Sequence, residues 1–211
     1  MREIAFVSTA IVSALLTVWM GVRYCRKVVR GDAHPPIATW FIFEIGIVMS
    51  LITYLTSHEH NVVKSITNAV DLFAVGAIFT TLLVMRRRGE KFPATKEERE
   101  NQRWCFRIIT CAFLLWAASH NPWVANVSFQ VVMIVAYWPM VKRLRRWREE
   151  KSPEPFDAWA VSATASFFGL CAALIGGGGL AVFYPLRSVI FCCAILRLIK
   201  QIERRNSSSA I

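Results

Sequence analysis

Charge is scarce in this chain, and most of it has one sign. Only 18% of the 211 residues are charged, whereas 55% are hydrophobic; soluble domains carry about 25% charged residues. Aspartate and glutamate together number 14 against 25 lysines and arginines, which gives a net charge of +11. This composition excludes an ordinary soluble domain and predicts an all-α integral membrane protein, because helices satisfy their own backbone hydrogen bonds within lipid.

Motifs of catalysis and of cofactor binding are also missing. The sequence has no nucleophile elbow, no phosphate-binding loop and no zinc-protease motif. Its six cysteines lie in or at the ends of apolar runs and form no Cys-x-x-Cys pair, which favours buried apolar side chains over a disulfide framework. We therefore expect that the protein is not an enzyme and has neither a metal site nor a cofactor.

Seven apolar runs approach or exceed the length that crosses a membrane, for which about 20 residues are needed. The shortest of them is the fourth. They span residues 4–24, 37–55, 62–85, 104–119, 123–141, 156–175 and 180–198.

The basic residues are not spread evenly between these runs. Of the 25, all but Arg2, Lys64 and Arg187 lie in four clusters after the first, third, fifth and seventh runs. All four clusters fall on one side of a seven-span layout, so the positive-inside rule predicts an outer N-terminus and a cytoplasmic C-terminus. We expect the clusters to contact anionic lipid, and their place at span ends argues against nucleic-acid binding.

One turn occurs twice in the chain. Each copy leaves an apolar run, crosses a basic stretch and re-enters an apolar run through a proline and a tryptophan. Pro36 and Pro155 are 119 positions apart, and so are Trp40 and Trp159. The same offset superposes the basic loops and the following runs, which predicts an internal duplication.

The duplication predicts seven transmembrane helices arranged as two parallel three-helix bundles joined by a linker helix. We expect a first unit over residues 1–88, a cytoplasmic segment and linker helix over 89–121, and a second unit over 122–205. A disordered tail is expected over 206–211. Four glycines at 176–179 permit either a hinge or a tight turn.

Two parallel three-helix units around a linker helix, with a proline after a basic loop, resemble the SWEET and PQ-loop transporter superfamily. The stretch from Gly31 to Trp40 also resembles bacterial SWEET-like membrane proteins. The resemblance implies a bacterial inner-membrane transporter that moves a small polar solute, such as a sugar, an amino acid or an organic anion, by alternating access. It also implies that Asn68 on the third helix contacts the substrate. A homo-oligomer and a non-transporting receptor or scaffold with this fold remain open alternatives.

Three ionisable residues fall well inside apolar runs, where a charge costs roughly 2.5–3.5 kcal/mol to insert. They are Glu44, Asp71 and Arg187. All three lie at mid-membrane depth, so we expect Arg187 to pair with one carboxylate, because its guanidinium does not readily lose a proton. The other carboxylate can then bind a proton and couple it to transport. A purely structural triad and an anionic substrate held by Arg187 are the alternatives.

A central substrate site is therefore predicted. Asn61, Lys64, Asn68 and Asp71 are spaced three or four apart and share one helix face, which predicts a water-accessible lining or a structural hydrogen-bonding seam. The expected site residues are Asn68, Asp71, Glu44, Tyr184 and Arg187.

The two tryptophans of the repeated turn have two interpretations. Trp40 and Trp159 are interfacial anchors, or they form an inner gate. Pro139 resembles the hinge proline of the superfamily, and Pro36 and Pro155 precede the two tryptophans. We expect these five residues to act in gating.

Overall fold

The computed structural model describes the chain except for residues 56–61, 91–95, 120, 148–151, 178 and 209–211. The described residues form seven α-helices and one short 3-10 turn, which confirms the all-helical prediction and the number of helices. The elements are α1 (Arg2–Val29), α2 (Ile37–Leu55), α3 (Val62–Arg87), α4 (Lys96–Ser119), α5 (Pro122–Arg146), α6 (Phe156–Ile175), η1 (Gly179–Val182) and α7 (Phe183–Ser208).

The predicted boundaries agree well at α2 and α6, which begin and end at the expected residues. At α7 the structure differs. The chain turns at Gly177 and Gly179, whose φ angles of 102° and 70° favour glycine, and passes through η1 before α7 begins. Pro185 lies in the first turn of α7, where its missing N–H costs no helical hydrogen bond. The helix then runs to Ser208, three residues into the segment expected to be a tail.

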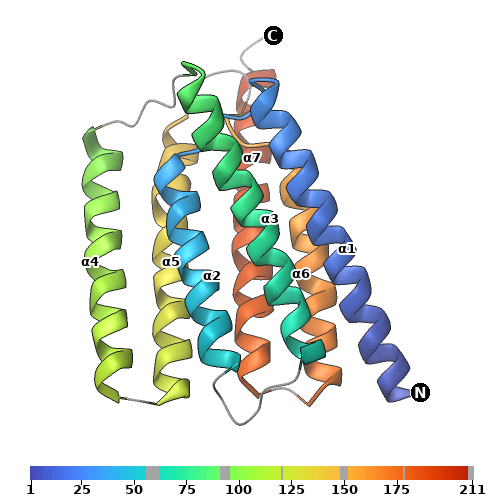
Figure 1. Ribbon diagram of the computed structural model, residues 1–211. Helices are drawn as coiled ribbons and strands as arrows, with labels where there is room; N and C mark the ends of the chain where they lie inside the picture. The colour runs from blue at the N-terminus through green and yellow to red at the C-terminus, as the bar shows by residue number, and fades with distance from the viewer. Residues whose placement is uncertain (56–61, 91–95, 120, 148–151, 178, 209–211) are drawn as a thin grey trace.

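Six helices form a closed ring, and α4 stands outside it (Figure 1). Around the ring each helix contacts the next in the order α1, α3, α2, α5, α7, α6 and back to α1. The helix α4 packs along α5. We call the end of the ring where α1, α3, α5 and α7 finish the basic end, because the four basic clusters lie there.

Helix α1 shows how polarity is distributed across the ring. Its buried face carries the small or polar residues Ala10, Ser13, Thr17 and Gly21, and, toward the C-terminal end, the larger Met20, Tyr24 and Val28. Its exposed face is a stripe of large apolar side chains: Ile4, Val7, Ile11, Leu15, Val18 and Val22. In water such an outer stripe would be an exposed apolar patch, whereas small residues at helix contacts and apolar residues outside are typical of membrane bundles.

Within the part of the chain that the structure describes, four helices are long and apolar enough to cross a membrane. Their apolar spans are Arg2–Val29, Ile66–Arg87, Trp123–Arg146 and Phe156–Ile175, and α2 contributes a shorter apolar stretch, Ile37–Ile52. This agrees with the membrane prediction. The described residues of α4 and α7 contribute no such span, and arginines such as Arg107 and Arg187 lie in their apolar runs.

Small residues set the close contacts between helices. The Ser13 hydroxyl donates to the Ala165 carbonyl at 2.8 Å and ties α1 to α6. A Cβ atom added to Gly21 would lie 3.1 Å from the Ala74 Cβ atom, so α1 and α3 approach closely only with glycine there.

One contact between α4 and α5 lies one turn before Pro139 of α5. Proline has no N–H, so Pro139 cannot donate to the carbonyl of Val135 one turn earlier. The buried Cys105 thiol of α4 lies 3.7 Å from that carbonyl and donates to it. A side chain of α4 thus replaces the backbone hydrogen bond that the proline removes.

Candidate functional site

A cavity of about 50 Å³ lies inside the ring. It has room for a few water molecules, since one water needs roughly 10–15 Å³ of cavity volume. Side chains from six ring helices line it. They are Thr17, Met20, Tyr24, Trp40, Phe43, Ile47, Thr67, Asp71, Val75, Met133, Tyr137, Ala158, Trp159, Ser162, Ser166, Tyr184, Pro185, Arg187 and Ser188.

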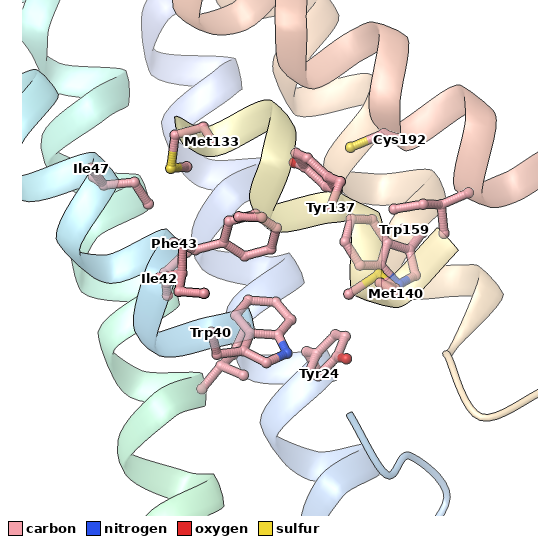
Figure 2. Close-up of a cluster of buried hydrophobic side chains, with 14 of the residues drawn as sticks. Tyr24, Trp40, Ile42, Phe43, Ile47, Met133, Tyr137, Met140, Trp159 and Cys192 are labelled. Carbon is pink, nitrogen blue, oxygen red and sulfur yellow. The ribbon is translucent and has the colours of Figure 1, made fainter. Parts of the chain in front are cut away.

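An aromatic cluster, Tyr24, Trp40, Phe43, Tyr137 and Trp159, lines the cavity toward the basic end (Figure 2). The Tyr24 and Trp40 ring centroids are 4.7 Å apart, and those of Trp40 and Trp159 are 6.4 Å apart. The ring centroids of Phe43 and Tyr137 are 4.6 Å apart, and those of Tyr137 and Trp159 are 6.4 Å apart. Rings from α1, α2, α5 and α6 therefore meet and separate the cavity from the basic end.

A buried carboxylate braces this cluster. Glu154, only 2% exposed, lies in the turn before α6. Its Oε2 atom accepts hydrogen bonds from the Tyr24 hydroxyl at 2.6 Å and from Trp159 Nε1 at 3.1 Å. Burial raises the pKa of the Glu154 carboxyl, whereas these two hydrogen bonds and the nearby Arg143 guanidinium act in the opposite direction. The carboxylate links α1 to α6 across the end of the cavity.

Further contacts join the two repeated turns outside this layer. Asp157, in the first turn of α6, forms half-exposed ion pairs with Arg23 at 3.3 Å and Lys27 at 3.7 Å. The His34 backbone N–H donates to the Pro153 carbonyl at 3.3 Å. The Arg143 guanidinium donates to the His34 carbonyl. The basic end is thus closed by aromatic contacts, a buried carboxylate and peripheral ion pairs.

A different contact spans the cavity nearer its other end. The Tyr184 hydroxyl on α7 donates to the Asp71 carboxylate on α3, and these two helices are not neighbours in the ring. The Arg187 guanidinium stacks on the Tyr184 ring, 4.7 Å from its centroid. Three of the five predicted site residues therefore line one cavity.

The ion pair expected for Arg187 is not formed. No carboxylate oxygen of the described residues lies within 4.0 Å of its nitrogens. Asp71 is occupied by Tyr184, and Glu44 does not line the cavity. The Glu44 carboxylate instead faces Gly76 of α3, where a Cβ atom would lie 3.1 Å from its Oε1 atom.

Asn68 also lies outside the cavity lining. Its amide nitrogen is 3.5 Å from the Ser50 hydroxyl, which Gln130 of α5 also approaches at 3.3 Å. The face predicted as a lining or a seam is therefore divided, with Asp71 on the cavity and Asn68 in a seam among α2, α3 and α5. Asn61 of that face lies outside the described residues.

The predicted gating residues surround the closure at the basic end. Trp40 and Trp159 are both buried members of the aromatic cluster rather than exposed at a surface. Pro36 directly precedes α2, and Pro155 caps the start of α6. Pro139 lies inside α5, two residues from Tyr137.

Sequence reasoning missed Tyr24, Tyr137 and Glu154. Glu154 stands between two prolines immediately before an apolar run, and an acidic residue in a basic loop was a signal worth following. No signal paired it with Tyr24, because the two are 130 positions apart.

No protein-family model, curated protein or solved structure matches the chain.

Proposed function

We propose that the protein is a SWEET-like integral membrane transporter of a small polar solute. In this proposal α1–α3 and α5–α7 are two parallel three-helix units, α4 is the linker, and all seven helices cross the membrane. The basic end faces the cytoplasm, as the positive-inside rule requires. The apolar outer stripe of α1 and the four long apolar helices support the membrane assignment.

The order of helices in the ring supports the duplication. Exchanging α1, α2 and α3 for α5, α6 and α7 turns the contacts α1–α3, α2–α3 and α1–α6 into α5–α7, α6–α7 and α5–α2, all of which occur. The ring is therefore compatible with a two-fold relation between the units. Parallel repeats in transporters are related by such an axis along the membrane normal.

Residues 119 positions apart also contact each other. Trp40 packs near Trp159, and the His34 N–H donates to the Pro153 carbonyl. Two equivalent residues can touch only close to the axis that relates them. These contacts therefore support an axis that passes through the aromatic cluster and the paired turns.

Two further contacts cross between the units at nearly equivalent positions: the offset of 119 relates Tyr24 to Arg143, and Glu154 to Pro35, the residue after His34. Tyr24 on α1 donates to Glu154 in the second turn. Arg143, which follows Tyr24 by 119 positions, donates from α5 to the carbonyl of His34 in the first turn. Each unit thus holds the turn of the other, as expected if separating the units opens the basic end.

The observation that carries the proposal is a cavity between the two units, lined by apolar side chains and a few polar ones, with a separate set of contacts across each end. The aromatic cluster and Glu154 bridge the units at the basic end, and Asp71 and Tyr184 bridge them nearer the other. Alternating access requires that one set opens while the other stays closed. A cavity with room for only a few waters fits a nearly occluded state of such a transporter.

Solute uptake into proteoliposomes tests this function. The protein should take up at least one radiolabelled solute from a panel of sugars, amino acids and organic acids. Asp71→Asn should abolish that uptake without changing the elution of the purified protein, whereas Glu3→Gln, at the exposed start of α1, should leave it unchanged. Folded protein that moves no solute of the panel would refute transport and favour a receptor or scaffold.

A further inference from the structure

We propose that Arg187 binds the carboxylate group of the transported solute, so that the substrates are small organic carboxylates. This inference rests on the proposed transport function and narrows it to one chemical class.

The first argument is the charge balance around Arg187. The side chain lines the cavity and is 6% exposed. Its Nη2 atom donates to the Ser188 hydroxyl at 3.3 Å, but its buried Nε and Nη1 atoms have no hydrogen-bond partner among the described residues. A guanidinium carries five N–H donors and keeps its charge. The Asp71 carboxylate attracts Arg187 only from beyond 4.0 Å, so the buried donors of the guanidinium stay unsatisfied, which is unfavourable. A carboxylate bound in the cavity would supply both the charge and the acceptors.

The second argument explains why Asp71 does not serve as that partner. Tyr184 contacts both residues, with its hydroxyl on the Asp71 carboxylate and its ring against the guanidinium of Arg187. The aspartate therefore has a neutral donor, and no ion pair forms within 4.0 Å. Because Asp71 accepts a hydrogen bond from Tyr184, the Nε and Nη1 donors of Arg187 stay available for a ligand.

The third argument is the size and lining of the cavity. Space for a few waters suits a solute of few heavy atoms better than a disaccharide. The hydroxyls of Ser162, Ser166 and Thr67 also line the cavity and suit a solute that carries its own hydroxyl or amino group. A neutral sugar would not offset the charge of Arg187, whereas a hydroxy acid or an amino acid would.

Binding to purified protein in detergent micelles tests the proposal with three solutes of equal size. Lactate and lactamide differ in one group, which is an anionic carboxylate in the first and a neutral amide of similar size in the second. Alanine keeps the carboxylate and has an ammonium in place of the hydroxyl of lactate. Calorimetry should show that lactate, alanine or both bind at least about tenfold more tightly than lactamide, since hydrogen bonds to charged groups are worth at least one such factor. Arg187→Gln should remove this preference, and Arg187→Lys should retain part of it. Arg197→Gln, exposed on the same helix, should leave it intact.

Thermal melting without solute separates a binding role from a structural one. If Arg187 is a ligand-binding residue, Arg187→Gln should melt at the same or a higher temperature without solute, because it removes a buried charge that no carboxylate contacts. If Arg187 instead balances Asp71 structurally, the variant should melt at a clearly lower temperature, and the proposal is overturned. Equal binding of lactate and lactamide by the wild type, or a carboxylate preference that survives Arg187→Gln, also overturns it.

The same solutes distinguish this proposal from the transport function. Flux of neutral solutes with no preference for carboxylates would overturn the role of Arg187 and leave transport intact. Arg187-dependent binding of lactate or alanine without flux of any solute would leave the carboxylate site intact and overturn transport.

Discussion

Replacing Tyr24 by phenylalanine removes one hydroxyl from the closure at the basic end and little else. The Tyr24 ring is 1% exposed and packs against Trp40 and Trp159, contacts that phenylalanine retains. What is lost is the 2.6 Å hydrogen bond to the buried Glu154 carboxylate. Glu154 Oε1 already lacks a hydrogen-bond partner among the described residues, so the variant leaves Trp159 Nε1 as the remaining side-chain donor to this carboxylate.

The size of the effect follows from the chemistry of that bond. A hydrogen bond to a charged group contributes about 1.5–3 kcal/mol. About 1.4 kcal/mol corresponds to tenfold in an equilibrium constant. If the proposed transport cycle is right, the closed form should therefore lose stability relative to a form open at the basic end by about tenfold to a hundredfold. A double-mutant cycle with Glu154→Gln should show coupling, since a neutral acceptor makes a weaker bond.

Thiol labelling measures the change in the open population. Ser162→Cys places a reporter in the cavity lining. A membrane-impermeant reagent is added to inverted vesicles, which present the basic end to the reagent if that end faces the cytoplasm as proposed. Peptide-resolved mass spectrometry separates this site from the native cysteines. Labelling should speed up about tenfold or more in Tyr24→Phe, because the rate follows the open population when reclosing is fast.

The matched control is Tyr137→Phe, the same exchange in the same aromatic cluster. The Tyr137 hydroxyl donates to no carboxylate in the described part of the chain. If Tyr24→Phe and Tyr137→Phe label at equal rates, the contact of Tyr24 with Glu154 does not hold the basic end closed, and the reasoning is refuted.

Three further predictions concern stability. The melting temperature of the wild type should fall as pH rises from the ordinary glutamate pKa to the raised pKa of Glu154, because the folded protein holds that proton more tightly than the unfolded chain. Glu154→Gln should flatten this dependence of melting temperature on pH. Parallel curves for the wild type and the variant would contradict the prediction. Cys105→Ala should destabilise the protein by about 1–3 kcal/mol because the Val135 carbonyl loses its donor, whereas Cys105→Ser should not, as denaturant titration can show. Gly21→Val should cost about 1–3 kcal/mol by the same titration, because its side chain meets Ala74 of α3; an unchanged midpoint would show that α1 moves away freely.

Much of the helical framework could be predicted from local sequence. The bounds of α2 and α6 follow from where apolar runs meet turn residues, such as Pro36 before α2 and Pro155 before α6. Hydropathy and turn chemistry act over a few neighbouring residues, and a single sequence contains that information in full. The common offset of Trp40 and Trp159 was likewise legible in the chain.

The candidate site was accessible only in part. The sequence marks Asp71, Arg187 and Glu44 as unusual, because a charge inside an apolar run stands out by itself. It does not say which of them meet. Asp71 and Arg187 line one cavity, whereas the Glu44 carboxylate faces Gly76 between α2 and α3.

The sequence alone therefore determined the helices, their apolar character and the repeated turn. Only the tertiary structure decided that the Tyr24 hydroxyl donates to Glu154, and that Asp71 accepts a hydrogen bond from Tyr184 instead of forming an ion pair with Arg187. The reason is geometric: each step along a helix turns a side chain by about 100°, so its partner depends on how the helix is rotated and how closely it packs. Rotation and spacing are set by contacts all around the ring, such as Gly21 against Ala74, and not by the neighbours of a residue along the chain.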